Sequence, residues 1–218
     1  MRLRNITGSE ELIKASRYFI EEPSDCLGKW QGFFANTNPV HIEIGMGKGQ
    51  FITEMARNNP AVNFIGIERY PSVLYRAVTK LDLVNPPLEN LAIICLDVRD
   101  ISTIFAASEV ERIYTNFPDP WHKKRHTRRR ITSQGFLSLY ENILIDGGML
   151  EMKTDDEQLF RYSMAEMALS GWHITYESHD LHRDETLSVG NVMSEYEEKF
   201  KSRGQRIMKI SVRCPQAR

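Results

Sequence analysis

The 218-residue sequence has no long hydrophobic run. Its longest unbroken apolar run, Leu91 to Leu96, has six residues, whereas a helix that spans a membrane needs about 20. The basic first residues are followed by the polar stretch 7–11 and lack the apolar stretch of a signal peptide. We therefore expect a cytoplasmic protein that does not contact a membrane.

Cysteine and histidine are few and do not form the patterns of a disulfide framework or a metal site. The cysteines are Cys26, Cys95 and Cys214, and no two of them are spaced as Cys-x-x-Cys. His179 and His182 are three residues apart, but they lie in a polar stretch with no cysteine partner. We expect reduced thiols and no bound metal.

A net charge of −1 hides one strongly basic stretch. Residues Lys123–Arg130, called the basic segment below, hold six Lys or Arg and no acid, which leaves 22 basic against 29 acidic residues elsewhere. A cationic patch on an otherwise acidic body predicts a local anionic partner. The hydrophobic content of 41% is enough for an ordinary globular core.

Short aliphatic or β-branched runs alternate with helical segments from Val40 onward. The runs cover 40–44, 63–67, 91–96, 113–115 and 149–152, and the helical segments cover 50–58, 71–83, 101–105, 132–144 and 158–170. This alternation predicts βαβ units and a mainly parallel sheet. Two further strand-like runs, 172–178 and 207–212, enclose a long polar insertion and predict an antiparallel closing pair.

The first 35 residues do not share this rhythm. Leu12, Ala15 and Phe19 recur at helical spacing after a possible cap at Ser9, and Pro23 ends the run. We therefore expect an N-terminal extension over 1–35, helical in part, followed by one domain over 36–218.

A glycine-rich turn, residues 43–49, follows the first predicted strand and precedes the helix that begins near Gln50. Glycine lacks a Cβ and tolerates positive φ, so the loop can touch a nucleotide-like ligand closely. Gly45, Gly47 and Gly49 are spaced G-x-G-x-G, unlike the G-x-G-x-x-G of dinucleotide-binding folds. The spacing therefore favours S-adenosylmethionine, with a ligand-free glycine turn as the alternative.

An acid ends each of the next two predicted strands, Glu68 after 63–67 and Asp97 after 91–96. Ligands of open parallel sheets bind at the carboxyl ends of the strands. These carboxylates are therefore candidates to accept hydrogen bonds from ribose hydroxyls and an adenine amino group. Either one alone is more often a solvated surface acid than a functional one.

A stiff turn, Phe117-Pro118-Asp119-Pro120-Trp121, follows the fourth predicted strand. Its two prolines fix the backbone around Asp119 and remove two amide donors. Trp121 offers a flat face on which a base can stack, and the basic segment offers phosphate contacts, a pairing typical of RNA binding. A buried tryptophan beside solvated charges is the alternative.

Together these motifs resemble the bacterial tRNA (guanine-N7-)-methyltransferases of the TrmB type. The resemblance runs from Val40 to Val212 and is most specific in the turn at 117–121 with the basic segment, in Lys153-Thr154-Asp155 and in the stretch 194–200. Ser194 stands where the family often has threonine, which keeps the hydroxyl. The resemblance implies a Rossmann-like class I S-adenosylmethionine-dependent methyltransferase fold, an α/β fold with a seven-stranded, mostly parallel sheet and an antiparallel closing strand.

The resemblance also implies the reaction and its residues. The methyl group of S-adenosylmethionine would pass to nitrogen 7 of a guanosine in the variable loop of tRNA, in a monomer or a homodimer. Residues implied to bind the cofactor are Glu43, Gly45, Gly47, Gly49, Glu68, Asp97 and Asp119. Residues implied to bind tRNA are Lys123, Arg125, Arg128, Arg129, Arg130, Asp155, Ser194, Glu195, Tyr196 and Glu197.

Asp119 is the candidate catalytic residue. Nitrogen 7 of guanine carries an in-plane lone pair and loses no proton on methylation, so no general base is obligatory. The enzyme mainly has to align the methyl group and stabilise the shifting charge. We interpret Asp119 as an orienting, electrostatic group, with a proton-abstracting base or a turn-forming residue as alternatives.

Three other functions are weaker predictions. A nicotinamide-dependent oxidoreductase is disfavoured by the glycine spacing, and a non-catalytic RNA-binding protein by the glycine loop with its strand-end acids. Transfer to an exocyclic base amine usually uses Asn/Asp-Pro-Pro-aromatic after the fourth strand, whereas here Asp119 separates the two prolines.

Overall fold

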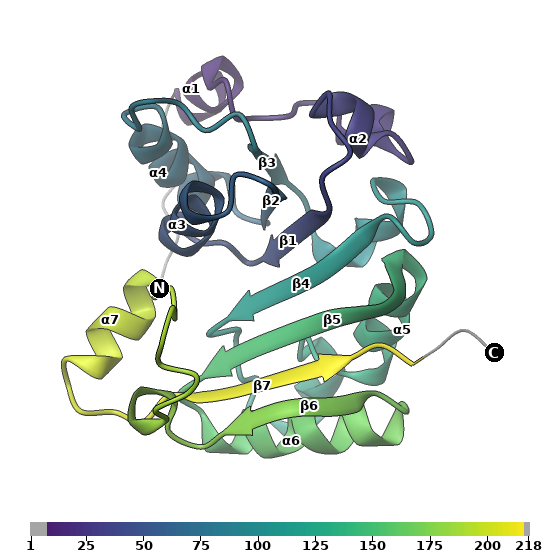
Figure 1. Cartoon of the computed structure of the whole chain (residues 1–218), viewed down its shortest axis with the longest axis vertical. Helices are drawn as coiled ribbons and strands as arrows, with labels where there is room; N and C mark the ends of the chain where they lie inside the picture. The colour runs from purple at the N-terminus through teal and green to yellow at the C-terminus, as the bar shows by residue number, and fades with distance from the viewer. Residues whose placement is uncertain (1–7, 216–218) are drawn as a thin grey trace. The chain divides into compact units, whose positions relative to one another are not determined.

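The computed structural model describes residues 8–215, and the chain divides into two compact units (Figure 1). Unit 1 is Met1–Ala106 and unit 2 is Ala107–Arg218. In the described range, this α/β fold has seven strands, three in unit 1 and four in unit 2. No helix of that range is long and apolar enough to span a bilayer.

Unit 1 is built on three parallel strands in the order β3-β2-β1, which are β1 (Val40–Ile44), β2 (Asn63–Glu68) and β3 (Leu91–Cys95). All residues of β1 and β2 are buried, in keeping with the continuous apolar runs typical of parallel strands. The register pairs Ile44 with Ile67 and Glu68 with Cys95. The carboxyl ends of the three strands therefore lie at one edge.

Two amphipathic helices connect these strands, α3 (Gln50–Asn58) and α4 (Pro71–Leu81). Pro71 occupies the first turn of α4, where a missing N–H leaves no intrahelical bond unmade. The buried side chains of α4 recur at i, i+3, i+4 and i+7, the spacing of one helix face, and are Leu74, Ala77, Val78 and Leu81. After β3 the chain forms the 3₁₀ helix η2 (Val98–Thr103), where the sequence predicted a helix over 101–105.

The helix of the N-terminal segment is shorter than the sequence predicts. Helix α1 (Ser9–Ala15) packs against α4 and ends well before Pro23. The residues after it run beside the edge strand β3, where Ile93 N–H donates to the Tyr18 carbonyl at 2.8 Å and Ile20 N–H donates to the Ile93 carbonyl at 3.0 Å. An edge strand presents unpaired backbone groups, and this pairing satisfies them at the cost of continuing the helix.

The 3₁₀ helix η1 (Pro23–Cys26) and the short helix α2 (Trp30–Phe33) complete this segment. Trp30 is fully buried, and its indole N–H donates to the Ile104 carbonyl at 2.8 Å. Part of the predicted extension, with the buried side chains Ile13, Tyr18 and Trp30, is therefore packed into the core of unit 1. The domain boundary between residues 35 and 36 stays a prediction.

Unit 2 has four strands in the order β4-β5-β7-β6, namely β4 (Val110–Asn116), β5 (Leu144–Thr154), β6 (His173–Ser178) and β7 (Met208–Arg213). Strands β4 and β5 are parallel, while β7 runs antiparallel to both β5 and β6. Helices α5 (Gln134–Ile143) and α6 (Glu157–Leu169) lie behind the strands of this unit in Figure 1. The predicted α/β fold with its antiparallel closing strand is confirmed.

Strand β5 is longer than predicted because it starts at Leu144, directly after α5. Its first residues include Gly147 and Gly148, which weaken the strand signal in the sequence. At Gly148 a Cβ would lie 3.0 Å from the Ile145 carbonyl oxygen and 3.1 Å from that of Glu111. Close backbone approach therefore accounts for this glycine, and the pairing of β4 with β5 is irregular nearby.

Helix α7 (Glu195–Lys201) lies within the polar insertion between β6 and β7, where the sequence analysis placed no helix. The Ser194 hydroxyl caps it by accepting from the Glu197 N–H at 3.2 Å. Ser-x-x-Glu is the sequence pattern of a capping box and could have revealed this helix. Two 3₁₀ helices, η3 (Lys124–Arg129) and η4 (Leu181–Arg183), complete unit 2.

Candidate functional site

In unit 1, the predicted ligand loop between β1 and α3 is held against the end of β2. The N–H groups of Gly45 and Met46 both donate to the Ile67 carbonyl, at 2.8 and 3.0 Å. Gly45 and Gly47 have φ of +74° and +60°, and a Cβ at either would meet no atom within 4 Å. The loop therefore presents bare backbone to open space, as a close-fitting ligand requires.

Glu68, at the end of β2, fastens this loop. One carboxylate oxygen accepts from Gly47 N–H at 3.1 Å, and the other accepts from Tyr70 N–H at 2.9 Å. The side chain is buried. A carboxylate offers about four lone-pair positions, so these bonds are compatible with a further one from a ligand hydroxyl.

Asp97, after β3, is held by two arginines that the sequence analysis did not connect with it. Its carboxylate accepts from Arg99 Nη2 at 2.7 Å and Nε at 3.0 Å, and Arg69 Nε lies 3.1 Å away. The Arg99 hydrogen bond lowers the pKa of Asp97 to about 2, although partial burial opposes this shift. Asp97 is therefore an ionised acceptor at the same sheet edge as Glu68.

The other two cofactor candidates of unit 1 are more enclosed. Glu43 lies in β1 and is 1% exposed. Gly49 caps the start of α3 with φ +81°, and a Cβ there would lie 3.7 Å from the Cβ of Ala77. We call Glu43, Gly45, Gly47, Gly49, Glu68 and Asp97 the glycine-loop group.

In unit 2, Asp119 is exposed at the tip of the turn that follows β4. Phe117 and Trp121, on either side of the Pro-Asp-Pro sequence, have φ of +53° and +44°, values uncommon outside glycine. The Arg130 guanidinium supports the turn, with Nε donating to the Pro120 carbonyl at 2.9 Å. Asp119 thus lies on a strained turn whose backbone is held in place by the hydrogen bond from Arg130.

Arg130 is the one arginine of the basic segment that faces inward. It is 4% exposed, and its guanidinium lies 4.3 Å from the centre of the Tyr162 ring. A side chain enclosed in this way does not present its charge to a phosphate. The phosphate contact of Arg130 stays a prediction, and in this structure its guanidinium instead holds the turn.

The rest of the basic segment is mostly exposed and lies on η3. The exposed cations are Lys123, Lys124, Arg125, Arg128 and Arg129. The Arg129 guanidinium lies 5.0 Å from the centre of the Trp121 ring, and the His126 ring packs edge-on to that ring at 5.5 Å. The structure thus brings the tryptophan and the predicted phosphate contacts into one surface.

Two further predicted substrate elements meet at the end of β5. Lys153 Nζ donates to a Glu197 carboxylate oxygen at 2.8 Å, which ties α7 to this strand. Lys153 and Glu197 are both buried, whereas Tyr196 is 59% exposed and Asp155 is exposed. Of the predicted substrate residues in this region, Glu197 is thus the one that is enclosed by the protein.

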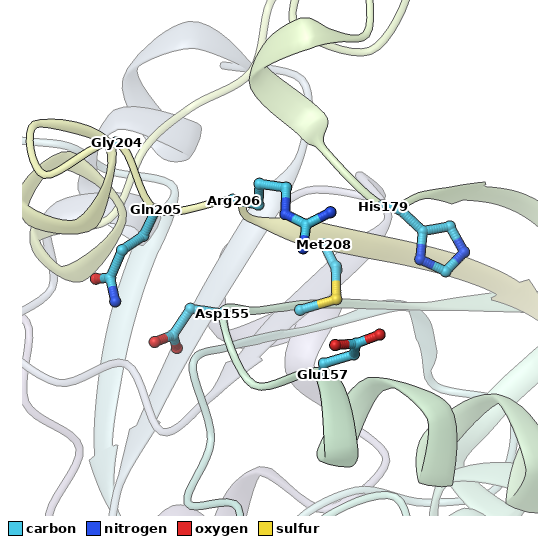
Figure 2. A pocket seen from close by; sticks show the side chains of 7 residues that line it. All are labelled: Asp155, Glu157, His179, Gly204, Gln205, Arg206 and Met208. Carbon is cyan, nitrogen blue, oxygen red and sulfur yellow. The ribbon is translucent and has the colours of Figure 1, made fainter.

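A pocket of about 340 Å³ lies beside Asp155 in unit 2 (Figure 2). In Figure 2 the carboxylates of Asp155 and Glu157 lie on one side of Met208, and the Arg206 guanidinium lies on the other. The pocket is lined by Asp155, Glu157, His179, Gly204, Gln205, Arg206 and Met208. Of these, the sequence predicts only Asp155 as a site residue, because the others come together from α6, the residue after β6, the chain before β7 and the start of β7.

The described residues contain no group of three or more His, Cys, Asp or Glu that could hold a metal ion. Glu68, Asp97 and Glu197 instead accept from backbone N–H, arginine and lysine groups, respectively. The arrangement in unit 1 suits a neutral or cationic ligand with hydroxyl and amino donors, and the surface in unit 2 suits an anionic one.

Comparison with known proteins points to one family. Residues 37–210 match a family model described as "Putative methyltransferase". The chain is 49% identical over 210 residues to the tRNA (guanine-N(7)-)-methyltransferase of Lachnoclostridium phytofermentans, which covers 96% of this chain and 97% of the relative. It is 48% identical over 216 residues to the protein of the same name from Geobacillus sp. (strain WCH70), covering 99% and 96%.

Solved structures with low sequence identity share the fold. An antibiotic-related methyltransferase superposes with a TM-score of 0.65 at 18% identity, covering 85% of this chain and 93% of that one. The 16S rRNA methyltransferase KamB superposes with a TM-score of 0.63 at 12% identity, covering 86% and 93%. At these identities the likeness concerns architecture alone.

Proposed function

The chain belongs to the family of tRNA (guanine-N7-)-methyltransferases, and on that basis we propose that the glycine-loop group binds the methyl donor while the exposed residues of unit 2 bind tRNA. The reaction of the family is the methylation of guanine N7 in tRNA. We further propose that the donor is S-adenosylmethionine and that the acceptor is a guanosine of the variable loop.

The glycine-loop group fits this donor. The bare backbone at Gly45 and Gly47 faces open space that a side chain would fill, which suits close contact with a nucleoside. Glu68 and Asp97 supply the acceptors for ribose hydroxyls and the adenine amino group, and Glu43 and Gly49 complete the wall. S-adenosylmethionine supplies an electrophilic methyl group on a sulfonium.

Asp119 is proposed to orient the guanine and to stabilise its charge. The purine gains positive charge at N7 in the transition state, so a carboxylate held in place favours that state over the ground state. The Pro-Asp-Pro turn limits the movement of Asp119. The hydrogen bond from Arg130 to the Pro120 carbonyl limits it further. Asp155, exposed at the end of β5, is proposed to accept from the N–H edge of the base.

The surface around Trp121 is proposed to hold the RNA backbone. Lys123, Arg125, Arg128 and Arg129 would contact phosphates and set affinity and register, without reading bases. Trp121 lies beside Arg129 and offers a face for an unstacked base. A tRNA substrate also makes the cytoplasm the proposed location, and either a monomer or a homodimer is compatible with this assignment.

The observation that carries the proposal is the 49% identity to a tRNA (guanine-N(7)-)-methyltransferase over nearly the whole of both chains. Incubation with methyl-labelled S-adenosylmethionine and bulk tRNA, followed by nucleoside mass spectrometry, tests it. We expect label in 7-methylguanosine, and no label in a transcript whose variable-loop guanosine is changed to adenosine. Label on an exocyclic amine would support the alternative transfer reaction instead.

A further inference from the structure

Lys153 is a buried cation at the carboxyl end of β5. It is 4% exposed, and its Nζ donates both to Glu197 Oε2 at 2.8 Å and to the Val192 carbonyl at 2.7 Å. The second bond reaches the chain just before α7, and the first reaches the first turn of α7 itself. The Lys153 ammonium group therefore holds both the chain just before α7, at Val192, and the first turn of α7, at Glu197.

The Glu197 carboxylate is enclosed by protein groups. It is 0% exposed, and its other oxygen accepts from Asn191 Nδ2 at 2.7 Å and lies 3.3 Å from His182 Nε2. The resemblance implies that Glu197 contacts the tRNA. In this structure, however, its oxygens face Lys153, Asn191 and His182, so a direct substrate contact would require the segment to open.

The backbone of Lys153 also reaches the turn that carries Asp119. Its carbonyl accepts from Phe117 N–H at 2.8 Å. The Phe117 ring in turn packs on α7, at 6.3 Å from the Tyr196 ring and 5.8 Å from the Phe200 ring. Asp155 follows Lys153 by two residues. Three proposed substrate elements, the Asp119 turn, Asp155 and the start of α7, thus meet at Lys153.

We propose that Lys153 is a positioning residue, which acts through its buried ion pair with Glu197 to lock residues 191–201 onto β5 and so to set the placement of Asp119 and Asp155. Glu197 is then part of the lock and makes no contact with the guanosine. The substrate roles of Asp119 and Asp155 rest on the proposed function. The lock itself rests on the contacts above.

A double-mutant cycle tests this coupling. Lys153→Met keeps the chain length without the charge, Glu197→Gln keeps an acceptor oxygen, and the double variant removes both charges of the pair. Single-turnover methylation at saturating tRNA and donor should slow by about a hundredfold in Lys153→Met, because a shift of about 1 Å in a reacting group has an effect of that size. The effects should be strongly non-additive, since both residues act through one contact.

Donor affinity, measured by calorimetry, should stay within about twofold of the parent in all three variants, which separates misplacement from unfolding. Lys80→Met and Glu198→Gln are the matched controls, because both side chains are exposed. Rate effects that add independently would overturn the proposal. So would a Lys153→Met variant that methylates at the parental rate.

Amide hydrogen exchange gives a readout that does not depend on activity. Release of the lock should raise exchange by about tenfold or more across residues 191–201, while the amides of α3 and β1 stay protected. Unchanged exchange over 191–201 in Lys153→Met would overturn the lock even if the enzyme slows. A parent protein that exchanges as described but methylates no tRNA guanine would instead contradict the proposed function.

Discussion

The Arg130 guanidinium donates to the Pro120 carbonyl at 2.9 Å, which places a buried cation directly beneath the turn that presents Asp119. Replacement by methionine removes the donors from carbonyl groups that stay partly buried. We expect Arg130→Met to lower the free energy of unfolding by about 1 to 3 kcal/mol. Urea unfolding measures this. Arg129→Met, on the exposed side of the same segment, should change the free energy of unfolding by less than about 0.5 kcal/mol.

The exposed arginines of the basic segment should act in the opposite way, on binding and not on stability. In the triple variant Arg125→Gln, Arg128→Gln and Arg129→Gln, the log–log slope of tRNA affinity against salt should flatten by about 0.7 to 0.9 for each phosphate contact that the substitutions remove. Filter binding between 50 and 200 mM salt, roughly the range in which such slopes are measured, gives this slope. An unchanged slope would mean that these arginines are a solvated surface.

For the donor site, the variants Gly47→Val and Glu68→Ala should weaken S-adenosylmethionine binding. Valine at Gly47 has to adopt a φ near +60° and puts methyl groups into the space above the loop. Loss of the Glu68 carboxylate removes an acceptor and frees the loop, at about 1.5 to 3 kcal/mol. Calorimetry with the donor measures the affinity. If both variants bind like the parent, the donor site lies elsewhere.

The variant Asp119→Asn should keep its fold and tRNA affinity while turnover falls. Asparagine is nearly isosteric, but it carries no negative charge to stabilise the purine cation. A loss of about 3 kcal/mol in transition-state stabilisation corresponds to a roughly hundredfold lower single-turnover rate. Asp146→Asn, at an exposed position of β5, should methylate at the parental rate. An Asp119→Asn variant as fast as the parent would exclude an electrostatic role.

Unfolding free energies measured at low pH should reveal the pairing of Asp97 with Arg69 and Arg99. Because the folded protein holds the pKa of Asp97 at about 2, below the ordinary value of about 3.9, the ionised group stabilises the fold above about pH 4. This stabilisation is lost as the pH falls toward 2. The difference in unfolding free energy between the parent and Asp97→Asn should therefore be constant from about pH 5 to 7 and shrink below pH 4. A difference that does not vary with pH would contradict the pairing.

Local patterns predicted the strands and helices of unit 1 well, since β1 and α3 begin and end at the predicted residues. Their signals are local: a buried aliphatic run in one case, and a glycine followed by a helical apolar face in the other. The predicted end of the first helix was wrong, because a contact distant in the sequence determines where α1 ends. Its last predicted turn is displaced by pairing with Ile93, a residue more than 70 positions away, which no local window contains.

The site residues likewise divide into those that local patterns predict and those that depend on distant contacts. The glycine spacing and the strand-end acids could be recognised because the parallel topology brings strand ends to one edge. The inward orientation of Arg130 could not be recognised, because the six Lys and Arg residues within positions 123–130 look alike until the fold buries one of them. The Lys153–Glu197 pair was also hidden, since its members are 44 residues apart and a glutamate in a polar stretch is usually solvated.

The segment Tyr18–Ile20 occupies the outer side of β3, whose residues are almost all aliphatic. A shortened protein that began at residue 36 would present this strand as an open, apolar template for backbone pairing between molecules. It would also lose Trp30 from the interior of unit 1. The pairing of residues 18–20 with β3 is therefore expected to limit self-association, and a chain without it is expected to precipitate.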